Sequence, residues 1–192
     1  MGFLLCKFEE VVTALHHEAK GQPWRGEHIT GLVSWTTPHK GWVVFNTDGA
    51  SKGNPGSAGG GGVLRGDRGE WKWAFTENMG YCSSMKAELK AILRGLRIAK
   101  EKGVSRLLVR SDSTVLVGML RGEMEPNPEH GALIEQCKRL VQEESWKVQI
   151  SHCYREANKV ADMLANIGVT LNNKFTFFDS PPPTGGDGCT HC

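Results

Sequence analysis

The chain has 192 residues, of which 39% are hydrophobic, and this is enough for one domain of ordinary size with a core of its own. The formal net charge of +2 excludes the acidic bias of a disordered chain and the broad basic field of a protein that binds nucleic acid by charge alone. A polyanionic partner would have to be met by a local basic patch or by metal ions.

Cysteine usage and the first residues indicate an intracellular protein. The six cysteines lack the dense spacing of a secreted disulfide scaffold, so we expect them to be reduced. Cys189 and Cys192 form an isolated C-x-x-C, which chance explains better than a zinc site. The apolar patch from Phe3 is short and interrupted by charges, so neither a signal peptide nor a membrane span is predicted. The expected compartment is the nucleus or the cytoplasm.

Residues 1–40 are predicted to hold a short amphipathic helix followed by a linker. Apolar residues recur at helical spacing from Phe8 to Leu15, and glycines and prolines interrupt residues 20–40. At the other end, residues 171–192 contain consecutive prolines and consecutive glycines, so we expect a disordered tail. The organised domain is therefore assigned to residues 41–170.

The domain begins with three predicted strands. An apolar run at 42–45 leads to Asp48, after which glycines bend the chain away. Residues 59–65 and 71–75 form a predicted hairpin, although the glycines at 59–62 weaken a strand unless a ligand or another backbone approaches closely there. Asp48 would thus lie at or near a strand end, where an acid can also simply open a turn.

A helical period replaces the strand pattern from Ser83 to about Gly103. The apolar side chains form one stripe, and Glu88 lies on its margin, where a carboxylate needs a partner or a cation. Residues 106–111 are predicted to form a strand parallel to an earlier one. Asp112 follows the end of this strand, where its alternative role is that of a helix N-cap.

Three further helices and a strand complete the domain. A short helix follows Asp112 and runs through Leu120, two more are expected at 130–144 and 157–168, and the strand at 146–150 leads to His152. Asp162 lies on the last of these helices. The predicted fold is α/β, with a mixed five-stranded sheet in which three antiparallel strands precede two parallel ones, flanked by helices.

Four acids from distant parts of the chain should meet in this fold. Asp48 and Asp112 would emerge at the same end of adjacent parallel strands, where open α/β sheets place ligands, while Glu88 and Asp162 approach from helices. Converging carboxylates raise one another's pKa unless cations neutralise them. Their hard oxygen atoms suit Mg²⁺ or Mn²⁺, and two such ions about 3.5–4 Å apart can clamp the attacking and leaving oxygens of a phosphoryl transfer.

The surroundings of these acids resemble type 1 ribonuclease H, in particular the reverse-transcriptase-associated ribonuclease H-like domain of plant non-LTR retrotransposons. The resemblance covers roughly residues 42–170, with a tryptophan-containing lead-in at 35–38, and the joint order of its motifs is what makes it specific. The motifs are Asn46-Thr47-Asp48-Gly49-Ala50-Ser51 with Gly53-Asn54-Pro55-Gly56, Lys86-Ala87-Glu88-Leu89, Ser111-Asp112-Ser113, the His-x-x-Arg-Glu-x-Asn segment from His152, and Asn158-Lys159-Val160-Ala161-Asp162.

This resemblance implies a ribonuclease H-like fold and an endonuclease that hydrolyses the RNA strand of RNA–DNA hybrids, leaving 3′-hydroxyl and 5′-phosphate ends. It implies that His152 moves a proton or helps to release product. The expected partners of a monomeric protein without membrane contact are the hybrid and, in a parent element, a reverse transcriptase. The implied catalytic metal ligands, for two Mg²⁺ ions or for Mn²⁺, are Asp48, Glu88, Asp112 and Asp162. Contacts to the hybrid are implied for Gly49, Ser51, Asn54, Ser83, Ser84, Thr114 and Asn158.

Two departures from the family pattern leave alternatives open. Tyr154 stands at the glycine of the family's mobile His-x-Gly loop, and residues 122–128 contain no basic handle for gripping a duplex. The alternative is a catalytically weak or inactive retroelement-derived domain that still binds nucleic acid. A nuclease of the same fold that acts on DNA is a third hypothesis, which the match of Asn54 to RNA-reading members disfavours.

Overall fold

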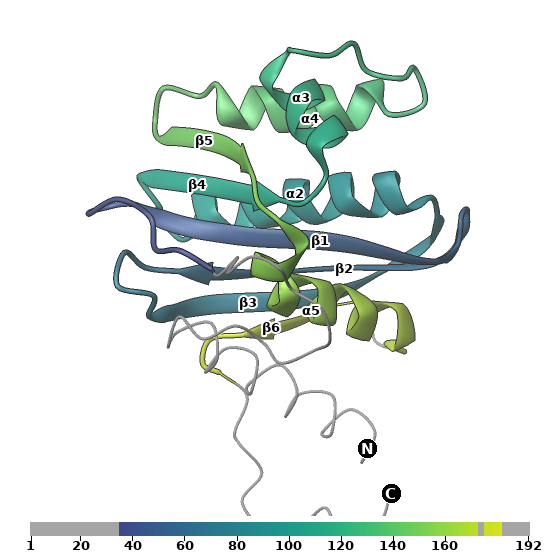
Figure 1. Ribbon diagram of the computed structural model, residues 1–192, viewed down its shortest axis with the longest axis horizontal. Coiled ribbons are helices and arrows are strands. Elements are labelled where there is room, and N and C mark those ends of the chain that lie inside the picture. The colour runs from purple at the N-terminus through teal and green to yellow at the C-terminus, as the bar shows by residue number, and fades with distance from the viewer. Residues whose placement is uncertain (1–34, 173–174, 182–192) are drawn as a thin grey trace, which may run out of the picture.

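The computed structural model describes residues 35–172 and 175–181. In these ranges six strands form one sheet, and helices lie on both of its faces (Figure 1). The predicted N-terminal helix and the pair Cys189 and Cys192 lie outside the described residues. The elements are β1 Val43–Gly53, β2 Gly56–Arg65, β3 Trp71–Cys82, α2 Ser84–Glu101, β4 Arg106–Ser111, α3 Thr114–Arg121, α4 Gly131–Val141, β5 Lys147–His152, a 3-10 helix Arg155–Ala157, α5 Lys159–Thr170 and β6 Phe175–Phe178.

The strand order of the sheet is β5-β4-β1-β2-β3-β6. β1 runs parallel to β4 and β4 parallel to β5, whereas the other neighbours pair antiparallel. This arrangement confirms the predicted α/β fold with a mixed sheet. Because β4 pairs directly with β1, the carboxyl ends of these two strands point the same way from the middle of the sheet. None of the helices that the structure describes combines the length and the apolar character that a membrane crossing requires.

A sixth strand, Phe175–Phe178, corrects the prediction of five strands, and for these four residues it also corrects the prediction of a disordered tail. This strand, β6, pairs antiparallel with β3 and carries alternating phenylalanines. The ring of Phe175 stacks on Phe75 with centroids 6.0 Å apart, and Phe177 lies 6.0 Å from Trp73. The neighbouring prolines and glycines concealed this alternation, which covers an edge that β3 would otherwise expose.

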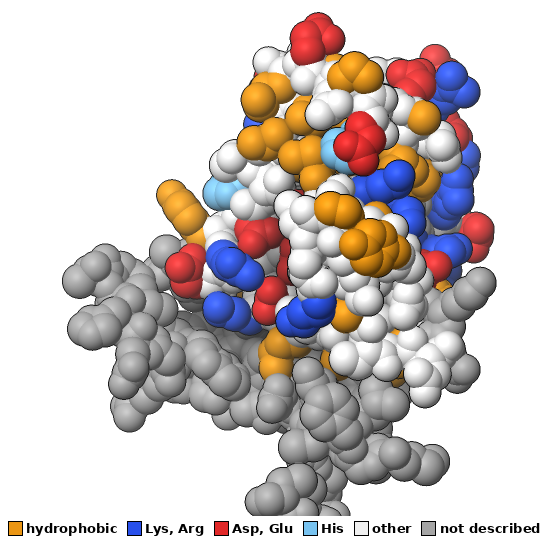
Figure 2. Space-filling view, turned by 90° about the vertical axis from the view of Figure 1, so that its right-hand side faces the viewer, with side chains coloured by type: hydrophobic (Ala, Val, Ile, Leu, Met, Phe, Trp, Pro, Cys, Tyr) orange, Lys and Arg blue, Asp and Glu red, His pale blue; other side chains and the backbone are white. Residues whose placement is uncertain are grey.

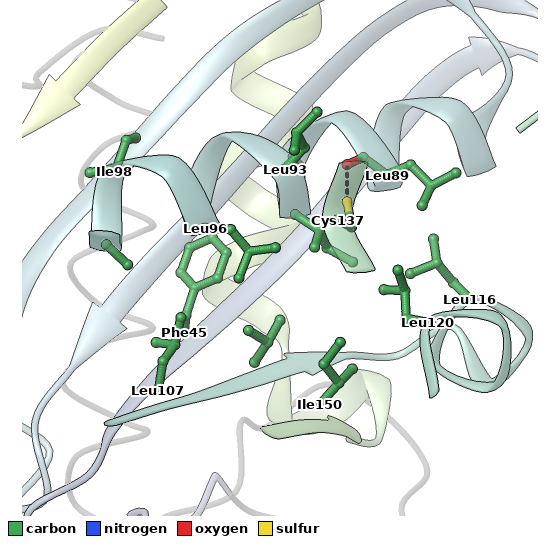
Figure 3. Close-up of a cluster of buried hydrophobic side chains, with 14 of the residues drawn as sticks. Phe45, Leu89, Leu93, Leu96, Ile98, Leu107, Leu116, Leu120, Cys137 and Ile150 are labelled. Atoms are coloured by element: carbon green, nitrogen blue, oxygen red, sulfur yellow. Dashed lines mark hydrogen bonds between the residues drawn. The ribbon is translucent and has the colours of Figure 1, made fainter. Parts of the chain in front are cut away.

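The predicted apolar stripe packs α2 onto the sheet. Its N-cap is Ser83, whose side chain accepts a hydrogen bond from the backbone nitrogen of Lys86 at 3.4 Å. Figure 3 shows Phe45 of β1 pointing toward Leu96 of α2, and both side chains are fully buried. This packing holds α2 over β1, and these two elements carry two of the four acids.

The glycine run in β2 allows a helix to lie directly on the sheet. A Cβ atom at Gly59 would overlap the backbone of Val169 in α5, and one at Gly61 would lie 2.7 Å from the backbone nitrogen of Ala165. The close backbone approach that such a glycine run requires is therefore made by α5. As a result, α5 and its carboxylate sit close to β1 and β2.

The ordered fold begins before residue 41, because Trp35 packs against the sheet. Its side chain is 7% exposed, its Nε1 donates to Asn46 Oδ1 at 2.8 Å, and the guanidinium of Arg65 lies 4.8 Å above its ring. The prediction that residues 1–40 hold only a helix and a linker is wrong for this residue. Its partners lie in β1 and β2, which a local sequence pattern does not reveal.

Candidate active site

The four predicted acids line one cavity of about 440 Å³. They reach it from four different elements or their ends, namely β1, α2, the end of β4 and α5. Figure 2 shows acidic side chains around a hollow on this side of the molecule, with basic side chains beside them. The acids that line the cavity are Asp48, Glu88, Asp112 and Asp162.

The separation of two strands makes room for the first pair of acids. β1 pairs with β4 only up to Asn46, and Asp48 lies two residues beyond that point. Asp112 directly follows Ser111, the last residue of β4. Both carboxylates therefore project where the two parallel strands part, which is the ligand-binding end of such a sheet.

Close backbone contact brings the third acid to the same place. A side chain at Gly49 would overlap the backbone of α2 at Glu88, so β1 and α2 touch directly. Glu88 Oε2 is buried and has no hydrogen-bond partner among the described residues. A buried carboxylate oxygen without a partner is costly, and a cation would relieve that cost.

The fourth acid has a basic neighbour. Asp162 lies in the first turn of α5, and its Oδ1 is 3.5 Å from Nη2 of Arg155. The guanidinium also lines the cavity, so it can face an anionic ligand as well as the carboxylate. Four acids and two basic side chains, Arg155 and Lys52, line the cavity, so acidic groups outnumber basic ones there.

Two of the acids, Asp48 and Glu88, have raised pKa values. Burial raises the pKa of Asp48 to about 8, with further contributions from the negative charges of Asp112, Glu88 and Asp162. Burial also raises the pKa of Glu88 to about 7, again with repulsion from Asp112, while Arg155 acts in the opposite direction. The sequence predicted that these carboxylates converge, and their common place in the cavity lining agrees with that prediction.

The residues present fit a hard divalent cation held in an open site. In the described ranges, no group of three or more His, Cys, Asp or Glu side chains is arranged to hold a metal ion by itself. Mg²⁺ usually keeps several waters and binds through one or two carboxylates plus substrate phosphates, so it does not require a closed protein cage. The unpartnered Glu88 oxygen and the all-oxygen donor set are consistent with that mode of binding.

Five of the residues predicted to contact the hybrid lie in or next to the cavity. Gly49, Ser51 and Ser84 line it. Ser83 caps α2 at its rim. Asn54, in the turn between β1 and β2, accepts a hydrogen bond at Oδ1 from the backbone nitrogen of Ser84 at 3.1 Å. The glycine turn and the start of α2 are therefore docked onto one another.

Two other predicted residues are exposed outside the cavity lining. His152 ends β5 opposite Ser111 in the β4–β5 register, and its ring meets the edge of Tyr154 at 5.7 Å. Thr114 is exposed at the start of α3. Both lie near the end of β4 that leads to Asp112, but neither lines the cavity.

The predicted contact of Asn158 with substrate is wrong for this structure. Asn158 is 1% exposed, and its side-chain amide bonds to β1 on both sides. Its Nδ2 donates to the carbonyl oxygen of Thr47 at 3.1 Å, and its Oδ1 accepts from Asn46 at 3.1 Å. Asn158 therefore links the start of α5 to β1, because its short polar side chain reaches the strand that lies beneath the helix.

Sequence reasoning missed several polar residues of the cavity. Ser113 follows Asp112 and caps α3, and Arg155 precedes α5. Lys52 Nζ lies 3.1 Å from Asn166 Oδ1, and both residues line the cavity. Asn166 is four residues after Asp162, so the helical period could have placed it on the same face.

The chain matches, over residues 46–168, the family model that is described as reverse transcriptase-like. An Arabidopsis thaliana protein whose name describes a candidate ribonuclease H is 44% identical to this chain over 154 residues. That similarity covers 80% of this chain and 25% of the Arabidopsis protein. The chain therefore spans about a quarter of the length of this relative.

Solved structures of ribonucleases H1 share the fold. The enzyme from the archaeon Halobacterium salinarum has a TM-score of 0.63 and 29% identity, covering 67% of this chain and 97% of its own. LC11-RNase H1, isolated from compost by a metagenomic approach, has been solved in complex with an RNA/DNA hybrid. Its TM-score is 0.63 at 26% identity, covering 66% of this chain and 96% of its own.

Proposed function

This chain belongs to the reverse transcriptase-like family, and on that premise we propose that it is a metal-dependent ribonuclease H. It hydrolyses the RNA strand of RNA–DNA hybrids as an endonuclease and leaves 3′-hydroxyl and 5′-phosphate ends. The observation that carries the proposal is the convergence of four carboxylates at one open cavity, where burial and the negative charges of the other three acids raise the pKa of Asp48 to about 8. The hybrid bound to LC11-RNase H1 supports the choice of substrate.

The carboxylates are the proposed ligands for Mg²⁺, with two ions expected and Mn²⁺ as the alternative. When bound, such ions supply Lewis-acid stabilisation of the charge that develops on a phosphate. Asp48 and Glu88, whose pKa values are raised, must release their protons for this binding. Arg155 lies 3.5 Å from Asp162, orients its carboxylate and presents positive charge toward the scissile phosphate.

The turn between β1 and β2 and the start of α2 are the proposed contacts to the sugars of the RNA strand. Asn54 and Ser84 are linked there by a hydrogen bond of 3.1 Å, close to the carboxylates. A 2′-hydroxyl, which can donate and accept, is what distinguishes RNA from DNA at such a site. His152, at the end of β5, is proposed to carry a proton to or from the leaving 3′ oxygen once substrate is bound.

A labelled hybrid incubated with the full chain and Mg²⁺ tests this function. We expect internal cuts in the RNA strand only, 5′-phosphate ends on the products, no cleavage in EDTA and none of double-stranded DNA. Asp112→Asn should abolish cleavage, because it removes one charge and one oxygen ligand. No cleavage by the wild type, or full cleavage by Asp112→Asn, would contradict the proposal.

The second candidate function is a nucleic-acid-binding domain that does not cut. It is favoured by the place of His152, which lies outside the cavity lining with its ring against Tyr154. Hybrid binding that persists in EDTA, with no turnover in Mg²⁺ or Mn²⁺, would identify this function. We also propose a reverse transcriptase in the parent element as a partner, because residues 122–128 contain no basic side chain to hold the duplex.

A further inference from the structure

A chain of buried hydrogen bonds lies next to the carboxylate cavity. Trp35 Nε1 donates to Asn46 Oδ1 at 2.8 Å. Asn46 Nδ2 donates to Asn158 Oδ1 at 3.1 Å. Asn158 Nδ2 in turn donates to the carbonyl oxygen of Thr47 at 3.1 Å. Both asparagines are 1% exposed, so water does not compete for these bonds.

The groups at the two ends of this chain of hydrogen bonds, which we call the relay, fix its donor-to-acceptor direction. The indole nitrogen of Trp35 can only donate, so the Asn46 atom that faces it must be the oxygen. The amide nitrogen of Asn46 then needs an acceptor, which orients the amide of Asn158 in the same sense. The relay ends on the carbonyl of Thr47, which can only accept. Reversing either amide would set two donors or two acceptors against each other.

The relay ends beside two of the proposed metal ligands. Thr47 is the residue before Asp48, and β1 stops pairing with β4 at Asn46. The carbonyl oxygen of Asn158 accepts the backbone N–H of Asp162 at 3.1 Å, which starts the turn of α5 that carries this acid. The relay therefore ties β1 to α5 where β1 and β4 separate and the cavity opens.

We infer that Trp35, Asn46 and Asn158 are positioning residues that hold Asp48 and Asp162 at the spacing a divalent cation needs. This inference rests on the proposed function of the cavity. Trp35 lies before the residues that match the family model, so it adds to the matched domain a side chain from the segment upstream. Residues that orient metal ligands from behind typically change metal affinity or activity by about 10–100-fold when they are mutated.

Trp35→Phe is the decisive variant, because it removes the indole N–H and keeps an aromatic ring beneath Arg65. Trp71→Phe is its matched control, since Trp71 Nε1 is also buried but has no hydrogen-bond partner among the described residues. Mg²⁺ affinity of the full chain is measured by calorimetry without nucleic acid. We expect about a 10-fold loss of affinity in Trp35→Phe and wild-type affinity in Trp71→Phe.

A second variant tests whether the effect passes through the relay. Asn158→Ala should weaken Mg²⁺ binding at least as much as Trp35→Phe does, and combining the two should cause no further loss, because the relay is already broken. Additive losses in the double variant would overturn the inference. So would an unchanged Mg²⁺ affinity in a Trp35→Phe protein whose unfolding midpoint has fallen, since that result describes a purely structural role.

The experiment separates this inference from the proposed function. A wild-type chain that binds Mg²⁺ but leaves the hybrid intact would contradict the nuclease, and the affinity comparison of Trp35→Phe with Trp71→Phe would still decide the relay. A chain that cleaves the hybrid with equal Mg²⁺ affinity in all variants would keep the nuclease and overturn the relay. A wild-type chain that binds no divalent cation would overturn both.

Discussion

Gly49 and Glu88 meet backbone to backbone: a Cβ atom at Gly49 would lie 2.6 Å from Cα of Glu88. β1 and α2 therefore carry their two acids into one cavity only because position 49 has no side chain. Gly49 does not adopt a left-handed backbone conformation, so it is the close approach of α2, and not a special φ, that requires a glycine at this position.

Gly49→Ala should push α2 away from β1. We expect a loss of stability of about 1–3 kcal/mol from overpacking, and a loss of cleavage that exceeds it because Glu88 moves away from Asp48. Chemical denaturation and hybrid cleavage measure the two effects. Gly131→Ala at the start of α4 is the control, because nothing lies within 4 Å of its added methyl group. Equal behaviour of the two variants would contradict the packing argument.

The raised pKa values predict how pH affects the metal-free protein. The pKa of Asp48 is about 8 and that of Glu88 about 7, compared with ordinary values of 3.8 and 4.5. The folded chain then holds protons that the unfolded chain has lost, so the free energy of unfolding should fall as pH rises from about 4 to about 8. Denaturant titrations in EDTA at several pH values measure this fall.

Mg²⁺ should counteract this fall in the free energy of unfolding. A cation binds the deprotonated carboxylates, so its stabilising effect should grow as the pH rises toward 8. Asp48→Asn provides the control, because it removes the group with the largest shift and should flatten the pH dependence in EDTA. A metal-free protein whose stability rises steadily between pH 5 and 8 would be inconsistent with buried, mutually repelling acids.

Arg155→Gln should weaken hybrid binding. The guanidinium lines the cavity beside Asp162, so its loss should raise KM and reduce the slope of log affinity against log salt by about 1. Arg139→Gln is the matched control, because Arg139 pairs with Glu135 on the exposed face of α4 and does not line the cavity. If the slope of log affinity against log salt were unchanged in Arg155→Gln, Arg155 would not be a contact to the substrate.

Phe177→Ala should destabilise the fold without changing the chemistry. The ring lies 6.0 Å from Trp73, and Lys102 Nζ lies 4.6 Å above it, so truncation should cost about 1–3 kcal/mol. The value of kcat should be unaffected, since β6 is the edge of the sheet that lies farthest from β4 and β5. Val115→Ala, at an exposed position of α3, should change stability by less than about 0.5 kcal/mol. A stable Phe177→Ala protein would mean that β6 contributes little to the domain.

The sequence alone determined the order of the elements from β1 to α5 and singled out the four acids that line one cavity. Apolar runs, glycine turns and a helical period are local properties, and they sufficed to place Asp112 after a strand and Asp48 on the strand beside it, although β1 continues past Asp48 to Gly53 instead of ending there as predicted. The glycine run in β2 also predicted that another backbone approaches this strand closely, and in the structure that backbone is α5. These features depend on residues near one another in the chain, so a linear reading can detect them.

Only the tertiary structure decided which polar residues face the cavity and which are buried behind it. Asn158 is a polar residue of the kind that contacts substrates, yet its side-chain amide donates to the carbonyl oxygen of Thr47, which lies 111 residues earlier in the chain. Trp35 lies in a segment with the composition of a linker, yet its indole finds a partner in β1. The free energy of a hydrogen bond between distant residues depends on burial, and burial is a property of the packed molecule that no local pattern contains.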